Sequence, residues 1–117
     1  MNTETKLIVA TGTTKVKKTA RSWRIWIEGN KLLKAGFVPE ARYSVHSQVE
    51  TDDYPARICL KLDANGDRKV TKASRNGKAR PIIDLHERLI VEIFPAVPVV
   101  EVAYLSTGFI LISEVQS

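Results

Sequence analysis

The chain has 117 residues, a hydrophobic fraction of 44%, a charged fraction of 26% and a formal net charge of +5. This length can bury one hydrophobic core but not two independent ones, so we expect a single folded domain. No apolar run approaches the roughly 20 residues that cross a bilayer, and the polar N-terminus lacks the pattern of a secretory signal, so we expect neither membrane binding nor secretion.

Few side chains suit metal binding or catalysis. The one cysteine, Cys59, cannot form an internal disulfide, which favours a reducing, cytoplasmic setting, and its apolar neighbours predict a buried thiol. With only His46 and His86 in addition, we expect no metal ion and no cofactor. His86 lies beside Glu87 and near Asp84, but a carboxylate at a helix start is the stronger interpretation. No nucleophile or phosphate-loop motif occurs, so we expect no enzymatic activity.

The first half predicts a strand–helix–strand order. Residues 1–14 are polar around one short apolar patch and end in Thr11-Gly12-Thr13-Thr14, which predicts a flexible N-terminal segment. Residues 23–28 alternate between apolar and polar and predict a strand with one of its two tryptophans exposed. The elements expected next are a short helix over 31–35 that stops at Gly36, and strands over 43–49 and 57–62.

The second half repeats this order. A turn over 63–67 separates it from the first half. The elements expected here are a short strand over 69–72, a basic hairpin turn over 74–78, a strand over 81–85, a helix over 87–94, and strands over 97–104 and 109–113 joined by a Gly turn.

The two halves therefore read as diverged copies of one unit. In each, a Lys-Val pair is followed by a basic stretch, a strand with two isoleucines, two adjacent aliphatic residues and a Phe. Matched points lie about 54 to 58 residues apart, a drift that small loop changes explain. The sequence predicts one domain over 15–117 made of two repeats, 15–62 and 69–113. Two such units can close one barrel and thereby hide their strand edges.

The positive charge is concentrated in two segments without acidic residues. Segments 15–24 and 68–80 hold 11 of the 18 basic residues, which leaves the rest of the chain net acidic. Clustered positive charge attracts phosphate backbones, although it is also compatible with two solvated loops.

Several short motifs resemble one known group of proteins. Lys31-Leu32-Leu33-Lys34-Ala35-Gly36-Phe37, after a strand, is similar to the core of SymE-like proteins in the SpoVT/AbrB swapped-hairpin group. Lys69-Val70-Thr71-Lys72 resembles the opening of AbrB-type domains, and Gly108-Phe109-Ile110-Leu111-Ile112 resembles the last SymE-like strand. The resemblance implies a mainly β fold: a swapped-hairpin, AbrB-like barrel formed by two strand–helix–strand repeats in one chain, as a pseudo-dimer.

The resemblance also implies DNA binding through basic residues around the first strand of each unit. These positions are Lys15, Lys17, Lys18, Arg21, Arg24, Lys72, Arg75, Lys78 and Arg80. They fall on the two basic segments, and a pseudo-twofold axis would bring both to one face. The expected function is that of a DNA-binding regulatory protein, a transcriptional repressor or an antitoxin-like protein, with double-stranded DNA as its partner.

Two other functions fit the same sequence. One is a SymE-like toxin or RNA-binding protein, with the same fold and a different target. The other is a small phage or mobile-element protein that binds and inhibits a host protein, in which case the basic face meets an acidic partner. A homodimer is a further possibility.

Overall fold

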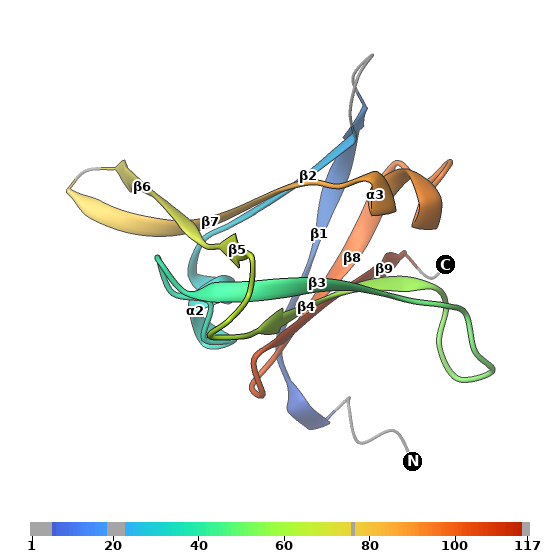
Figure 1. Ribbon diagram of the computed structural model, residues 1–117, viewed down its shortest axis with the longest axis horizontal. Coiled ribbons are helices and arrows are strands. Elements are labelled where there is room, and N and C mark those ends of the chain that lie inside the picture. The colour runs from blue at the N-terminus through green and yellow to red at the C-terminus, as the bar shows by residue number, and fades with distance from the viewer. Residues whose placement is uncertain (1–5, 19–22, 76, 116–117) are drawn as a thin grey trace.

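The computed structural model (Figure 1) describes residues 6–18, 23–75 and 77–115. Its elements, in chain order, are β1 (Ile8–Lys18), β2 (Trp23–Glu28), α2 (Asn30–Lys34), β3 (Arg42–Gln48), β4 (Arg57–Leu62), β5 (Arg68–Lys69), β6 (Thr71–Arg75), β7 (Lys78–His86), α3 (Arg88–Ile93), β8 (Val99–Leu105) and β9 (Phe109–Glu114). The prediction of a mainly β fold is confirmed.

The strands form one antiparallel sheet that nearly closes into a barrel. Its order is β5-β3-β4-β9-β8-β1-β2-β7-β6. Only Val70 separates the two outermost strands, β5 and β6, in the chain. Val70 is fully buried, and its backbone exchanges hydrogen bonds of 2.8 and 2.9 Å with Ala41 and Glu40. Figure 1 shows β6 and β7 extending away from the β3, β4, β8 and β9 part of the barrel.

Alternating burial explains why these segments are strands. In β2, Ile25 and Ile27 are buried, whereas Trp26 between them is 36% exposed. This is the expected pattern for a strand with one face on the core. β4 differs, because its first four residues, 57–60, are all buried. Both β2 and β4 begin and end at the residues that the sequence predicts. Cys59 is buried, as expected.

Each helix is short and contributes one fully buried aliphatic residue to the common core. Leu32 in α2 and Ile90 in α3 belong to the same apolar cluster as Phe37 and Phe94, which follow the two helices. Gly36, with a φ of 85°, ends α2 in the left-handed conformation that favours glycine. Most helical stability therefore comes from this tertiary packing, since five or six residues do not form a stable helix alone.

The N-terminal segment differs from expectation. Residues 8–14 were predicted to be flexible, but they form the first part of β1 and pair with β8 from Ile8 opposite Leu105 to Thr14 opposite Val100. The prediction is wrong for these residues because the strand is specified by pairing with β8, about ninety residues away, rather than by local apolar alternation. The predicted strand over 69–72 is also divided, at Val70, into β5 and β6.

Candidate nucleic-acid interface

The candidate interface lies on the outer face of the four strands β1, β2, β7 and β6. The register places Lys17 opposite Arg24, Arg24 opposite His86, and Trp26 opposite Asp84. Directly opposed residues in antiparallel strands share a face of the sheet. These five side chains therefore lie on the side that faces away from the core.

The same face continues along β1 and β7. Lys15 alternates with buried Val16, and Lys78 and Arg80 share the parity of Asp84 along β7. We call the surface formed by Lys15, Lys17, Arg24, Trp26, Lys78 and Arg80 the outer basic face. Its basic residues come from both of the segments that the sequence singles out.

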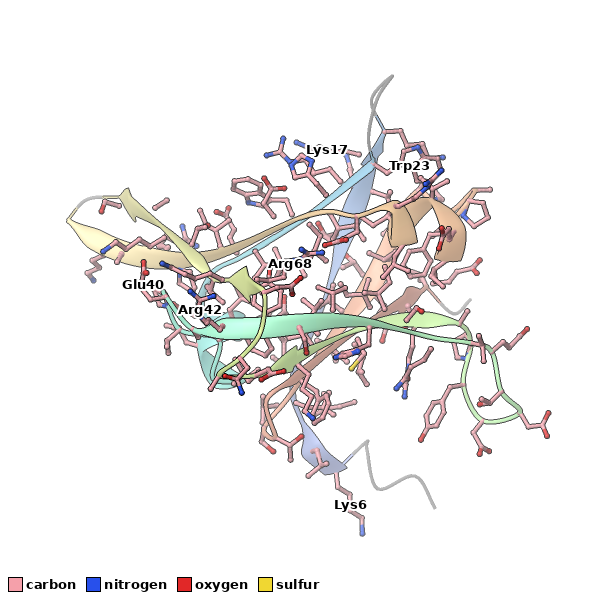
Figure 2. The ribbon with its side chains drawn as sticks, in the orientation of Figure 1. Lys6, Lys17, Trp23, Glu40, Arg42 and Arg68 are labelled. Atoms are coloured by element: carbon pink, nitrogen blue, oxygen red, sulfur yellow. The ribbon has the colours of Figure 1, made fainter. Side chains whose placement is uncertain are left out.

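Other predicted site residues do not lie on the outer basic face. Lys18 is opposite Trp23, with its Nζ 4.5 Å from the centroid of that ring. Lys72 is opposite buried Pro81. Both therefore belong to the other side of the sheet, and Figure 2 shows Lys17 and Trp23 on opposite sides of the paired strands. Arg21 lies outside the described residues, and of Arg75 only the backbone in β6 is described.

A bidentate ion pair between Arg24 and Asp84 lies at the centre of the outer basic face. Arg24 donates from Nε to Asp84 Oδ1 at 2.7 Å and from Nη2 to Oδ2 at 2.6 Å. These hydrogen bonds lower the pKa of the Asp84 carboxyl and raise the pKa of the Arg24 guanidinium. His86 Nε2 lies 3.2 Å from Asp84 Oδ2. Arg24, predicted as a nucleic-acid ligand, therefore has two of its donors directed at Asp84.

Two hollows flank Trp26. The first, with a volume of about 390 Å³, is lined by Thr14, Lys15, Lys17, Arg24 and Trp26. The second, of about 470 Å³, lies where β1 and β2 diverge, because the two strands pair only from Val16–Ile25 to Lys18–Trp23. Trp26 therefore separates two concave surfaces, each of which has basic side chains in its wall.

Sequence reasoning missed one basic residue of the second hollow. Lys31, from α2, donates its Nζ to the Thr11 carbonyl oxygen at 2.7 Å and so connects the helix to β1. Arg80 from β7 lines the same hollow. No local signal distinguishes Lys31 from other exposed helix lysines, because its position depends on how α2 packs beside β1.

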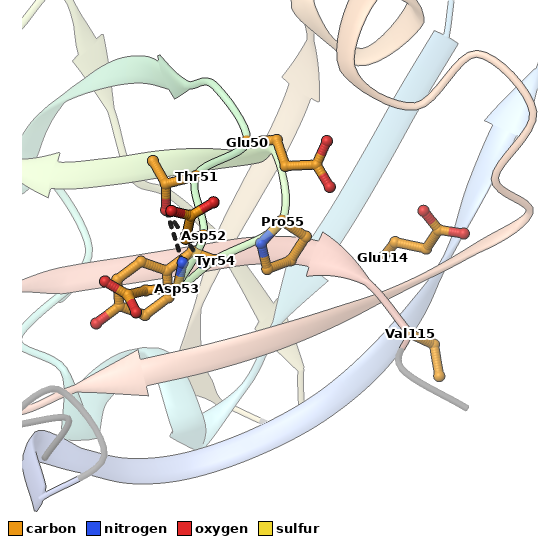
Figure 3. A pocket seen from close by; sticks show the side chains of 8 residues that line it. All are labelled: Glu50, Thr51, Asp52, Asp53, Tyr54, Pro55, Glu114 and Val115. Carbon is orange, nitrogen blue, oxygen red and sulfur yellow. Dashed lines mark hydrogen bonds between the residues drawn. The ribbon is translucent and has the colours of Figure 1, made fainter.

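Acidic side chains gather elsewhere. Glu50, Asp52, Asp53 and Glu114 line a pocket of about 450 Å³ between the β3–β4 connection and the end of β9, shown in Figure 3. The Thr51 hydroxyl accepts hydrogen bonds from two backbone amides of this connection. Figure 1 shows the connection at the opposite end of the molecule from the β6–β7 hairpin. The acidic loop is therefore far from Lys78.

Within the described ranges, no three His, Cys, Asp or Glu side chains are grouped so that they could hold a metal ion. In the same residues, no helix has the length and apolar character that spanning a membrane requires. Comparison of the chain with known protein families, curated proteins and solved structures finds no match.

Proposed function

We propose that the protein binds nucleic acid through the outer basic face and acts as a DNA-binding regulator, in the role of a repressor or an antitoxin-like protein. The observation that carries this proposal is that Lys15, Lys17, Lys78 and Arg80 lie on the same side of the sheet, spread from the β1–β2 pair to the β6–β7 hairpin. In the described part of the chain, none of these four forms an ion pair with a carboxylate. Unpaired surface cations of this kind are suited to contact phosphates and release counterions.

The pairing of the strands supports a swapped-hairpin pseudo-dimer of repeats 15–62 and 69–113. Ile25 and Ile83, and likewise Leu32 and Ile90, occupy matched positions and are buried in one core. If each residue is replaced by its counterpart in the other repeat, the pair Ile25–Leu85 becomes Ile83–Ile27. Both pairs occur between β2 and β7.

Other strand pairs correspond between the two repeats in the same way. The pair Lys15–Val99 between β1 and β8 corresponds to Lys69–Arg42 between β5 and β3. The pair Val45–Leu60 between β3 and β4 corresponds to Val102–Ile112 between β8 and β9. A twofold relation of this kind would bring Lys15, Lys17, Lys78 and Arg80 to one side of the sheet, which supports a joint binding face.

Fluorescence anisotropy with labelled duplex DNA and with RNA, from low to physiological salt, tests the proposal. The variant Lys17→Glu/Lys78→Glu should weaken binding by about tenfold or more and reduce the slope of log K against log salt by about 2. Lys61→Glu, an equally exposed lysine of β4 outside the outer basic face, is the matched control and should have little effect. No binding at low salt, or an equal loss in the control, would overturn the proposal.

One observation favours a second candidate, an RNA-binding protein of the SymE-like kind. Trp26 is exposed on the outer basic face, and exposed aromatic side chains among cations are frequent where single-stranded RNA binds. The RNA arm of the same titration separates the two: tighter binding of RNA than of duplex DNA of equal length favours this candidate.

A further inference from the structure

Trp26 is an unusual side chain for its position. It lies at the centre of the outer basic face, 36% exposed, in a strand whose other outward residues are Arg24 and Glu28. The ring is not part of the apolar core, which is filled from the opposite face of β2 by Ile25 and Ile27. An exposed indole loses favourable burial energy, so a ligand that covers the ring would recover it.

The indole is also held in place. The Arg24 guanidinium carbon lies 5.3 Å from the centroid of the ring, and Asp84 fixes that guanidinium with two hydrogen bonds. Thr14 Oγ1 donates to the Trp26 carbonyl oxygen at 3.0 Å, which connects β1 to the same residue of β2. A ring ordered before binding loses little conformational entropy when a ligand stacks on it.

The hollow beside the ring combines an aromatic wall with the ammonium groups of Lys15 and Lys17, which form no ion pair within the described ranges. Thr14, Lys15, Lys17 and Arg24 complete its lining. Its volume of about 390 Å³ lies within the range of about 300–1,000 Å³ usual for small-ligand sites. An aromatic surface next to ammonium groups is complementary to a nucleotide, whose base stacks while its phosphate contacts lysine.

We propose that Trp26 is a stacking subsite for one unpaired base, with Lys15 and Lys17 contacting the adjoining phosphates. A base within a duplex has both faces covered by its neighbours and offers this site only its backbone. Trp26 therefore adds to the binding of single-stranded nucleic acid, DNA or RNA, and adds nothing to the binding of a duplex. This inference rests on the proposed function of the outer basic face in nucleic-acid binding.

Among the residues that the structure describes, the other repeat has no equivalent of this site. Asp84, which lies opposite Trp26 across the centre of the β2–β7 pair, is a carboxylate rather than a second aromatic residue. Thr71 of β6, at the position that matches Lys17, is uncharged. A barrel with matched halves thus has one stacking site, and each chain is expected to bind one stacked base there.

The test uses the full chain with Trp23→Phe, which leaves Trp26 as the only tryptophan. The probes are a short single-stranded DNA, an RNA of the same sequence and the matching duplex. We expect both single strands to quench Trp26 fluorescence and the duplex to bind with less quenching. Trp26→Ala should weaken single-strand binding by about tenfold or more, and Trp26→Phe should retain most of it.

The matched control changes a second exposed apolar side chain, which lies outside the outer basic face. Leu33→Ala removes an equally exposed apolar side chain, 41% exposed, from α2 and should leave binding unchanged. If the protein binds the probes and Trp26→Ala leaves single-strand binding unchanged, the stacking subsite is wrong while the nucleic-acid function stands. If none of the three probes binds at low salt, both are wrong.

Discussion

The Arg24–Asp84 pair shows what a single contact does on the outer basic face. The two residues are 60 positions apart in the chain and lie two register positions from direct opposition, since Arg24 is opposite His86 and Trp26 is opposite Asp84. Sequence reasoning related Asp84 only to its neighbour His86, because proximity in the chain is visible and proximity across strands is not. Asp84 thereby restrains a guanidinium on a face that otherwise has free cations.

Asp84→Asn should therefore strengthen nucleic-acid binding. The change removes the negative charge from the centre of the outer basic face and frees the Arg24 donors for phosphate. We expect a slope of log K against log salt that is steeper by about 1, measured by anisotropy. Glu114→Gln, which removes a carboxylate from the distant acidic pocket, is the control. An unchanged slope in Asp84→Asn would contradict the assignment of Asp84 as a restraint.

The same pair makes stability depend on pH in the acid range. Because the Arg24 hydrogen bonds lower the pKa of Asp84 in the folded state, its contribution is fully present above the ordinary value of 3.8 and is lost as pH falls through the lower folded pKa. The unfolding free energies of the protein and of Asp84→Asn should therefore differ at pH 7 and converge in strong acid. Urea titrations at several pH values measure this difference.

Gly66 is a second residue whose identity is fixed by its surroundings. A Cβ at this position would lie 2.3 Å from the Tyr43 carbonyl oxygen and 2.5 Å from its carbon, both backbone atoms that cannot move aside cheaply. Gly66→Ala should lower the free energy of unfolding by about 3 kcal/mol or more. Gly77→Ala is the comparison: φ is 77° but nothing lies within 4 Å, so the cost should be about 1–2 kcal/mol of backbone strain. Denaturant titration distinguishes the two.

At the scale of elements, alternation of residue type along the sequence predicts strands. β2 and β4 are predicted to the residue because Ile25, Ile27, Ile58 and Leu60 alternate with other residue types, although β4 is buried on both faces over residues 57–60. The helices are predicted to within one residue at each end, with Gly36 as a reliable stop. These signals are local, so no knowledge of the rest of the chain is needed to interpret them.

β1 is a strand whose first part local sequence signals do not predict. Thr11, Gly12, Thr13 and Thr14 have neither apolar alternation nor strong burial, yet they are paired with Ala103, Val102, Glu101 and Val100 of β8. Likewise, the sequence alone does not show which basic residues belong to the outer basic face. Its basic segments are visible in the sequence, but strand parity assigns Lys18 and Lys72 to the other side, and packing of α2 adds Lys31 near the face.

A proline in β1 tests whether that strand is structural. The Val16 amide donates to the Pro98 carbonyl oxygen at 2.9 Å, and two residues earlier the Thr14 amide has the same direction toward β8. Thr14→Pro should lower the free energy of unfolding by about 2–3 kcal/mol, since it removes a ladder donor. Thr14→Val removes the hydroxyl bond to Trp26 but keeps the amide, and should cost less than about 1 kcal/mol. Equal losses in the two variants would contradict a structural role for the β1–β8 ladder.

For the whole molecule, the two halves of the chain are interdependent. β1 pairs with β8, β2 with β7, β3 with β5 and β4 with β9, so each of these four strands of the first half has a partner from the second half. Within the first half, β1 also pairs with β2, and β3 with β4. The core likewise mixes both halves, with Phe37 and Phe94 in one cluster. Neither half has enough of its own neighbours to bury its strands.

Fragments 1–64 and 65–117, separated at the exposed β4–β5 connection, should therefore fold only together. Each fragment alone should lack a cooperative unfolding transition, and an equimolar mixture should recover the β-sheet circular dichroism of the intact chain. Ellipticity followed against temperature at several concentrations measures this recovery. Cooperative unfolding of either fragment by itself would contradict the interdependence.

The pairing of β1 with β8 also orders events in time. A ribosome adds about 5–20 residues per second, so β1 is made on the order of 5–20 s before the strand that completes its ladder. During that interval one hydrogen-bonding edge of the nascent chain has no native neighbour, and open strand edges of this kind promote aggregation. Lys15, Lys17 and Lys18 lie at the exposed end of β1, so we expect their charge to oppose aggregation of this strand before β8 is made. For Lys15 and Lys17 this would be a second role beside the contact with phosphate that we propose.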